Sequence, residues 1–187
     1  GRRVRHAKHG SITHGAHGGP YYHGNFMGIE IERKFLLKND NWKSLVTETH
    51  VIKQGYLQSG LETSQKSSVR IRISNKLANI NIKSIDLHMV RQEFEYEIPL
   101  HAAKQMLSTL CGDVVIEKTR YYVPYGSHLW EVDVFEGANA GLQMAEIELG
   151  SVDESFEKPD WAGDEVTEDR RYYNISLIKS PYRVWAK

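Results

Sequence analysis

Apolar and charged residues alternate along much of this chain, and the alternation predicts β-strands. Residues 68–74, Ser-Val-Arg-Ile-Arg-Ile-Ser, show it most clearly, since three β-branched residues alternate with two arginines. Because successive side chains of a strand point to opposite faces of a sheet, one face of this strand would be apolar and the other basic. Pattern and composition predict seven further strands, at residues 28–37, 51–59, 79–85, 91–98, 114–123, 128–135 and 143–149.

Helices are predicted at four places between or after these strands. Residues 100–110 carry four apolar residues on one helical stripe. Shorter helices are expected at residues 41–48 and 151–158, and a last one at residues 168–178, with Thr167 as its N-cap.

Eight strands with mostly short connections favour an antiparallel sheet over a parallel α/β fold. The strands of a parallel sheet are buried on both faces and would read as continuous apolar runs. We therefore predict a mainly β protein of the α+β class, an eight-stranded antiparallel β-barrel with flanking helices.

The charged strand faces are expected to line the inside of this barrel. Few helical stripes are available to cover eight apolar strand faces from one side of a flat sheet. In addition, Arg and Glu dominate the polar faces, whereas solvated strands usually mix Thr, Ser, Gln and Lys. The alternative is a single-layer sheet whose charges lie in water. With the charges inside, they must pair with one another or bind ions.

The overall composition excludes several classes of protein. The 24 basic residues balance the 24 acidic ones, so the chain carries no nucleic-acid signature. A single cysteine, Cys111, excludes a disulfide framework and a thiolate metal cluster. No apolar run has the length of a membrane span, and we expect a soluble, cytoplasmic protein without a membrane partner. The apolar outer strand faces make a homodimer a further possibility.

The first 26 residues differ from the rest in composition. They contain four basic residues, no acidic residue and five of the nine histidines. We interpret residues 1–26 as a tag-like or disordered leader and residues 27–187 as one domain. A basic nucleic-acid arm and a metal-binding histidine tract are the alternatives for the leader.

The charged faces combine two kinds of chemistry. Glu30, Glu32 and Lys34 alternate along the first strand, and paired carboxylates are ligands for hard divalent cations such as Mg²⁺ or Mn²⁺. Such a strand is also compatible with an ordinary salt-bridged surface. Five basic residues on later strands suit a multiply charged oxyanion, because Arg and Lys donate hydrogen bonds to phosphate oxygens. They are Arg70, Arg72, Lys83, Lys118 and Arg120. Together these groups indicate a metal–polyphosphate site, which suits phosphoryl transfer.

These motifs resemble the CYTH domain family, also known as triphosphate tunnel metalloenzymes, and most closely its short stand-alone bacterial members. The first of them, Glu30-x-Glu32-x-Lys34, is similar to the family's Glu-x-Glu-x-Lys signature. The resemblance covers essentially all of residues 28–178. It continues through residues 54–57, 69–72, 82–83, 93–98, 117–121, 130–135, 146–148 and 165–172.

The resemblance implies an eight-stranded tunnel that hydrolyses triphosphates with a divalent metal. The candidate catalytic residues are Lys34, Asp133 and Tyr56. Asp133 is implied to orient the attacking water or a second metal. Tyr56 is expected either near Lys34, whose ammonium would favour the phenolate, or as a buried tyrosine whose hydroxyl is satisfied. Glu93, Glu95 and Glu97 are implied either to take part or only to pair with the arginines. The implied metal ligands are Glu30, Glu32, Glu146 and Glu148, and the implied triphosphate ligands are Lys34, Arg70, Arg72, Lys83, Lys118 and Arg120.

Inorganic tripolyphosphate is the expected substrate, because no motif for a nucleobase pocket is visible. A class IV-type adenylate cyclase, which converts ATP to cyclic AMP and pyrophosphate, is the first alternative within this family. A nucleoside or thiamine triphosphatase uses the same chemistry. A non-catalytic polyphosphate-binding module would need only the basic residues, so the set of carboxylates argues against it.

Overall fold

The computed structural model describes residues 26–59, 65–85 and 90–185. For residues 26–30 and 90–91 it describes the backbone alone. The leader predicted over residues 1–26 therefore lies, apart from Phe26, outside the described residues.

The eight predicted strands are confirmed, with ends that differ by a few residues. The described residues form one further strand, β9, a four-residue segment without alternation that pairs only with the end of β1. The strands are β1 (Phe26–Leu37), β2 (Glu48–Gln58), β3 (Ser67–Ser74), β4 (Leu77–Ser84), β5 (Val90–Glu97), β6 (Ile116–Tyr125), β7 (His128–Phe135), β8 (Gln143–Glu148) and β9 (Ala162–Glu165).

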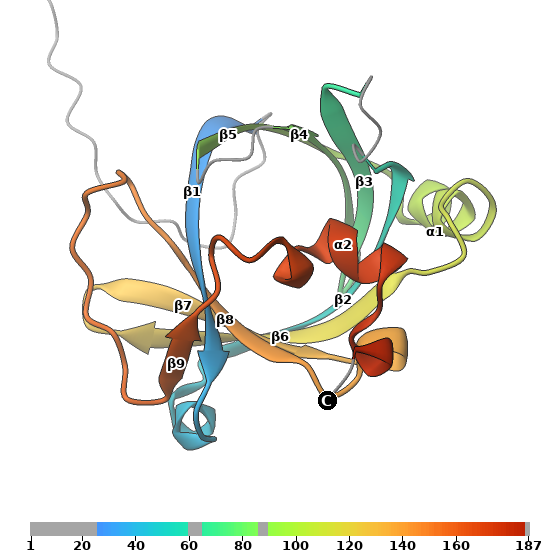
Figure 1. Cartoon of the computed structure of the whole chain (residues 1–187). Helices are drawn as coiled ribbons and strands as arrows, with labels where there is room; N and C mark the ends of the chain where they lie inside the picture. Colours follow the sequence, from blue (N-terminus) through green and yellow to red (C-terminus); the bar gives the residue numbers. More distant parts are fainter. Residues whose placement is uncertain (1–25, 60–64, 86–89, 186–187) are drawn as a thin grey trace, which may run out of the picture.

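The strands form one antiparallel sheet whose ends meet. Its order is β5-β4-β3-β2-β6-β7-β8-β1-β9, and β1 also pairs with β5. Strand β1 pairs with β5 along its first half, Phe26–Ile31, and with β8 along its second half, Glu32–Leu36. Such staggered pairing is expected for strands that tilt around a barrel. Strands β1 to β8 accordingly form a ring (Figure 1), as predicted.

The helices agree less well with the sequence pattern. Helix α1 (Leu100–Thr109) is confirmed, and the helix expected at 41–48 is a short 3-10 helix, η1 (Asn41–Leu45). The helix expected at 151–158 is wrong, since these residues form turns and extended chain. This segment lacks an apolar stripe, and its Phe156 instead packs against the rings of Phe35 and Trp130.

The last predicted helix, 168–178, is broken into two pieces. They are η3 (Arg170–Tyr172) and α2 (Asn174–Lys179), and two further 3-10 helices are η2 (Gly137–Asn139) and η4 (Tyr182–Val184). Tyr173, not Thr167, occupies the N-cap position of α2. The Thr167 hydroxyl accepts a hydrogen bond from the backbone N–H of Lys34 instead.

Apolar side chains lie mainly outside the ring, where other segments cover them. One cluster includes Trp130, Ile147 and Trp161. A second places α1 against β3 and β4 through Ala103 and Leu107. Many charged side chains of the same strands point inward, as predicted, and several are buried: Lys34, Arg70, Lys118, Arg120, Asp133 and Glu146.

Helix α2 covers one end of the ring. It crosses the middle of the ring in Figure 1, and its fully buried Leu177 packs with Ile116, Phe135 and Met144. These side chains close that end of the lumen with an apolar cluster. Within the described residues, no helix has the length and apolar character that crossing a membrane requires.

We predict that Leu177→Ala will lower the free energy of unfolding by about 2–5 kcal/mol, because truncation leaves a cavity at this apolar end. Leu110→Ala is the matched control, since Leu110 is 63% exposed and its loss should cost less than about 0.5 kcal/mol. Urea unfolding of the two variants checks this. Equal losses would show that α2 does not seal the ring.

Candidate functional site

A cavity of about 200 Å³ lies inside the ring, and most of its lining residues are charged. It brings together nine of the residues predicted from the sequence: Glu32, Lys34, Tyr56, Arg70, Arg72, Lys83, Arg120, Glu146 and Glu148. Glu93, Glu95, Glu131, Ser68, Ile147 and the segment Tyr173–Ile175 complete the lining.

The register of the strands explains why these side chains meet. On β1 and β8, Glu32 lies opposite Glu148, and Lys34 lies opposite Glu146. On β7 and β8, Glu131 lies opposite Glu146. Directly opposed residues of antiparallel strands share a face and lie close enough to interact. Strands β1, β7 and β8 therefore form one acidic wall of the cavity, with Lys34 within it.

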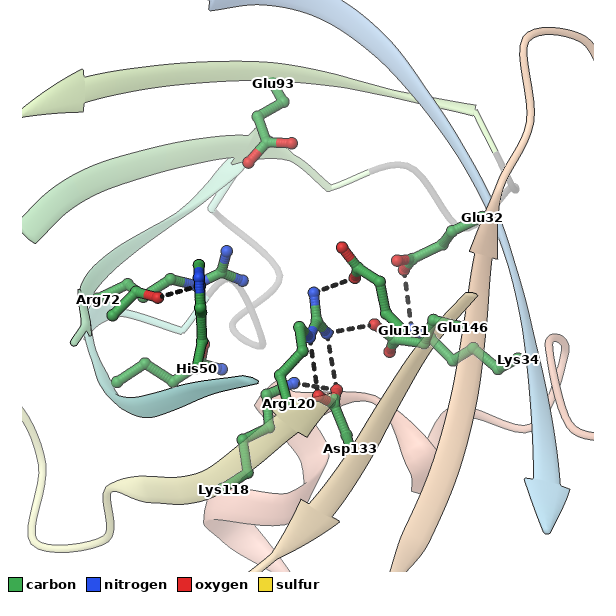
Figure 2. Close-up of polar contacts among 12 residues, drawn as sticks. Glu32, Lys34, His50, Arg72, Glu93, Lys118, Arg120, Glu131, Asp133 and Glu146 are labelled. Atoms are coloured by element: carbon green, nitrogen blue, oxygen red, sulfur yellow. Dashed lines mark hydrogen bonds and ion pairs between the residues drawn. The ribbon is translucent and has the colours of Figure 1, made fainter. Parts of the chain in front are cut away.

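Glu146 is the centre of the buried ion-pair network. Its Oε1 atom lies 2.5 Å from Lys34 Nζ, and its Oε2 atom accepts a hydrogen bond of 2.7 Å from Arg120 Nη2. Lys34 Nζ also lies 3.0 Å from Glu32 Oε1. Burial opposes ionisation of Glu146, but Lys34 and Arg120 outweigh it and hold the pKa of Glu146 well below its usual value. Figure 2 shows this network.

Arg120 connects the cavity to a deeper ion pair. Its guanidinium donates to Asp133 through Nε at 2.8 Å and through Nη2 at 2.7 Å, and it also donates to Glu131. Asp133 in turn accepts from Lys118 Nζ. Lys118 and Asp133 are almost completely buried and do not line the cavity. Burial, reinforced by repulsion from Arg120, lowers the pKa of Lys118 to about 8 despite the attraction of Asp133.

Arg70 and Arg72 of β3 and Lys83 of β4 form the basic wall of the cavity, which has buried hydrogen-bond donors without a partner among the described residues. The Nε and Nη2 atoms of Arg70 are buried and have no hydrogen-bond partner among the described residues. Arg72 donates from Nε to Gln54 Oε1 at 3.3 Å. Burial, together with the charges of Arg70 and Arg120, lowers the pKa of Arg72. Buried donors and crowded positive charges favour the binding of an anion here.

The glutamates of β5 differ in their surroundings. Glu93 lies 3.3 Å from Lys83 Nζ, and although burial opposes its ionisation, Lys83 and Arg70 lower its pKa. Glu95 accepts hydrogen bonds from the side-chain amides of Asn79 and Asn81. Glu97 is exposed and does not line the cavity.

The acidic wall has the donor chemistry of a site for a hard divalent cation. Opposed carboxylates repel each other, and a cation between them removes the repulsion. Burial raises the pKa of Glu131 and outweighs the opposing charge of Arg120, and the nearby Glu146 and Asp133 raise it further. In the described side chains, no three metal-ligating groups surround one point as they stand. Glu30 lies in β1, but its side chain is outside the described residues.

Several lining residues are not among the site residues predicted from the sequence. Glu131 had a usable signal, because it alternates with Asp133 on the charged face of β7. Ser68 is the inward-facing residue two before Arg70 on β3. For Glu93 and Glu95 the sequence predicts either a role in the site or only pairing with the arginines. The segment Tyr173–Ile175 had no signal, since a turn and a 3-10 helix carry it over the cavity.

Comparison with known proteins agrees with this geometry. The CYTH domain family matches residues 28–180 of the chain. An inorganic triphosphatase of Acetivibrio thermocellus is 43% identical over 157 residues, covering 84% of this chain and 97% of that protein. An inorganic triphosphatase of Nitrosomonas europaea is 36% identical over 161 residues, covering 81% and 97%.

A solved structure gives the same result. The crystal structure of the inorganic triphosphatase NE1496 superposes with a TM-score of 0.59 at 32% identity, and the match covers 81% of this chain and 95% of that one. The family, its sequence motifs and the ring of charged strands coincide over the same residues. This chain belongs to the CYTH domain family.

Proposed function

We propose that the protein is a metal-dependent triphosphatase that hydrolyses inorganic tripolyphosphate to pyrophosphate and phosphate. The observation that carries this proposal is the division of one cavity into a basic wall and an acidic wall. The basic wall matches the oxygens of a polyphosphate, and the acidic wall matches a divalent cation. The relatives named inorganic triphosphatases support the same activity.

The basic residues bind the triphosphate chain. Arg70 has two buried donors without partners, so an anion gains hydrogen bonds there without breaking existing ones. Arg72 and Lys83 line the same side of the cavity. Lys34 and Arg120 already contact Glu146, and we assign them to the end of the substrate near the acidic wall.

Glu32, Glu146 and Glu148, with Glu30, are the residues that would hold Mg²⁺ or Mn²⁺. An ion held there would supply positive charge that stabilises the phosphate oxygens and the leaving group. The carboxylates prefer such hard cations because all their ligand atoms are oxygens. The residues do not distinguish the two ions, so the assay below includes both.

Hydrolysis needs a positioned water and stabilisation of negative charge rather than covalent catalysis. We assign the attacking water to Glu131, which lines the cavity and whose raised pKa suits a proton acceptor. Attack at the terminal phosphorus breaks its bond to the bridging oxygen, and the proton passes from water to Glu131. Asp133 is predicted for this role from the family resemblance, but it does not line the cavity. It accepts a hydrogen bond from Arg120, and we propose that it orients that guanidinium. Tyr56 lines the cavity, and we assign it to the substrate site.

The test is release of phosphate from tripolyphosphate and from ATP, measured side by side with Mg²⁺, with Mn²⁺ and with EDTA. We expect fast release from tripolyphosphate with a divalent ion, loss of activity in EDTA, and much slower reaction with ATP. The mostly charged lining offers little apolar surface for a nucleobase.

Other outcomes would replace this proposal. Cyclic AMP and pyrophosphate from ATP would identify an adenylate cyclase. Phosphate release from nucleoside or thiamine triphosphates, but not from tripolyphosphate, would identify a triphosphatase of the same chemistry with a different substrate. Tight binding of tripolyphosphate without turnover would leave a binding module.

A second prediction concerns the unpartnered donors of Arg70. Arg70→Lys should raise the KM for tripolyphosphate about tenfold, because an ammonium cannot reproduce the forked donors of a guanidinium. Arg183→Lys is the control, because Arg183 is exposed near the C-terminal end of the described chain. An unchanged KM in Arg70→Lys would place its guanidinium outside the substrate site.

A third prediction follows from Lys118, whose pKa falls from an ordinary 10.5 to about 8. Between these two values the unfolded chain binds more protons than the folded protein, so rising pH favours folding. Relative to Lys118→Met, the free energy of unfolding of the wild type should therefore rise by up to about 3 kcal/mol between pH 7 and pH 10.5. Urea unfolding at several pH values measures this, and a constant difference across that window would contradict it.

A further inference from the structure

The segment that follows β9 connects two sides of the cavity through one residue, Thr167. Thr167 is 5% exposed and is not itself a lining residue. Its neighbours in space are Lys34 in β1 and Tyr173, and both of these line the cavity.

Lys34 turns its backbone toward this segment. Its carbonyl accepts a hydrogen bond of 2.8 Å from the N–H of Val166, as in a strand ladder. Its N–H donates a hydrogen bond of 3.0 Å to the Thr167 hydroxyl. In a regular ladder the acceptor at this point would be a backbone carbonyl. The side chain of Thr167 therefore completes the ladder while the backbone leaves it. An unpartnered Lys34 N–H would otherwise be buried at this point.

The Thr167 hydroxyl is oriented by a second hydrogen bond, in which it is the donor. Thr167 Oγ1 donates a hydrogen bond of 2.7 Å to Glu165 Oε1, which also accepts a hydrogen bond of 2.8 Å from Arg33 Nε. Since the hydroxyl proton is committed to Glu165, a lone pair of Oγ1 faces the Lys34 N–H. Arg33 and Glu165 thus hold the acceptor in place from the outside of the ring.

The Val166 carbonyl, which would continue the ladder, accepts a hydrogen bond of 3.1 Å from the N–H of Asp169 instead, and the backbone carbonyl of Thr167 has a partner of its own. It accepts a hydrogen bond of 3.0 Å from the Tyr173 hydroxyl. Tyr173 leads directly into α2, and the segment Tyr173–Ile175 lies on the cavity. One residue consequently sets the position of the Lys34 backbone and the position of Tyr173 at the same time.

We propose that Thr167 is a positioning residue of the triphosphate site: its hydroxyl fixes Lys34, and its carbonyl fixes Tyr173, on two sides of the bound chain. This inference rests on the proposed function. Because Lys34 Nζ contacts both Glu32 and Glu146, a shift of its backbone also disturbs the acidic wall. Small displacements of binding groups reduce rates and affinities strongly.

The experiment compares Thr167→Val with Thr167→Ser. Valine keeps the shape of threonine but removes the hydroxyl, whereas serine keeps it. Thr119→Val is the matched control, because the Thr119 hydroxyl also donates to a glutamate, Glu136 Oε1 at 3.0 Å, on the exposed side of β6. The measurements are kcat and KM for tripolyphosphate, and the dissociation constant of tripolyphosphate by calorimetry in EDTA.

We expect Thr167→Val to raise the KM and the dissociation constant about tenfold, with a smaller change in kcat. Thr167→Ser and Thr119→Val should stay within about twofold of wild type. Amide hydrogen exchange at Lys34 should accelerate in Thr167→Val and not in the other two variants. This exchange measurement does not depend on catalysis.

A lower melting temperature in Thr167→Val with an unchanged KM would reduce Thr167 to a structural role and overturn the inference. If Thr167→Val does not fold, Tyr173→Phe tests the second bond, and an unchanged KM there overturns it as well. A wild type that neither hydrolyses nor binds tripolyphosphate would instead overturn the proposed function. The two failures are therefore distinguishable.

Discussion

The interaction on which the rest of the structure depends is the pairing of charges inside the ring. Taking isolated charges out of water is prohibitively costly, so a barrel with charged residues inside is stable only if most of these charges pair with one another or bind an ion. Glu146 provides this at the centre, because it contacts Lys34 from β1 and Arg120 from β6 at once. The apolar faces of the same strands are then free to pack outward against α1 and the segment around Phe156.

The pairing is uneven across the lumen, and the unevenness gives the cavity its chemistry. Around Arg70 and Arg72, positive charge and unpartnered donors exceed the nearby acceptors. Around Glu131, burial together with the carboxylates of Glu146 and Asp133 raises its pKa, although Arg120 opposes the shift. An interior of well-packed apolar side chains could be as stable, but it would offer nothing to an anion or a cation. The separation of the basic side chains from the opposed carboxylates fits a ligand that carries phosphate oxygens and a metal together.

The sequence predicted the ring well because alternation reports a local property, the face to which each side chain points. This is why the strands, and Lys34, Arg72 and Glu148 on the inside, were found. Short elements without periodicity cannot be predicted in this way. Strand β9 has only four residues, and the segment around Phe156 is extended where a helix is predicted, because its ring packs against Trp130. Thr167 carries the signature of a helix N-cap, but a tertiary contact with Lys34 uses its hydroxyl instead.

Alternation does not, however, give depth along the axis of the barrel. Lys118 shares the alternating positions of β6 with Arg120, and Asp133 shares those of β7 with Glu131, so all four side chains point inward in the same way. Depth is set by the register between strands, which places Lys118 opposite Phe135 and Asp133 opposite Met144, next to the apolar end that α2 covers. Arg120 lies two residues after Lys118 in β6, and Glu131 lies two residues before Asp133 in β7. Both of these side chains reach the cavity. Whether an inward charge meets the ligand or supports a residue that does is therefore decided by strand pairing, which no single strand's sequence contains.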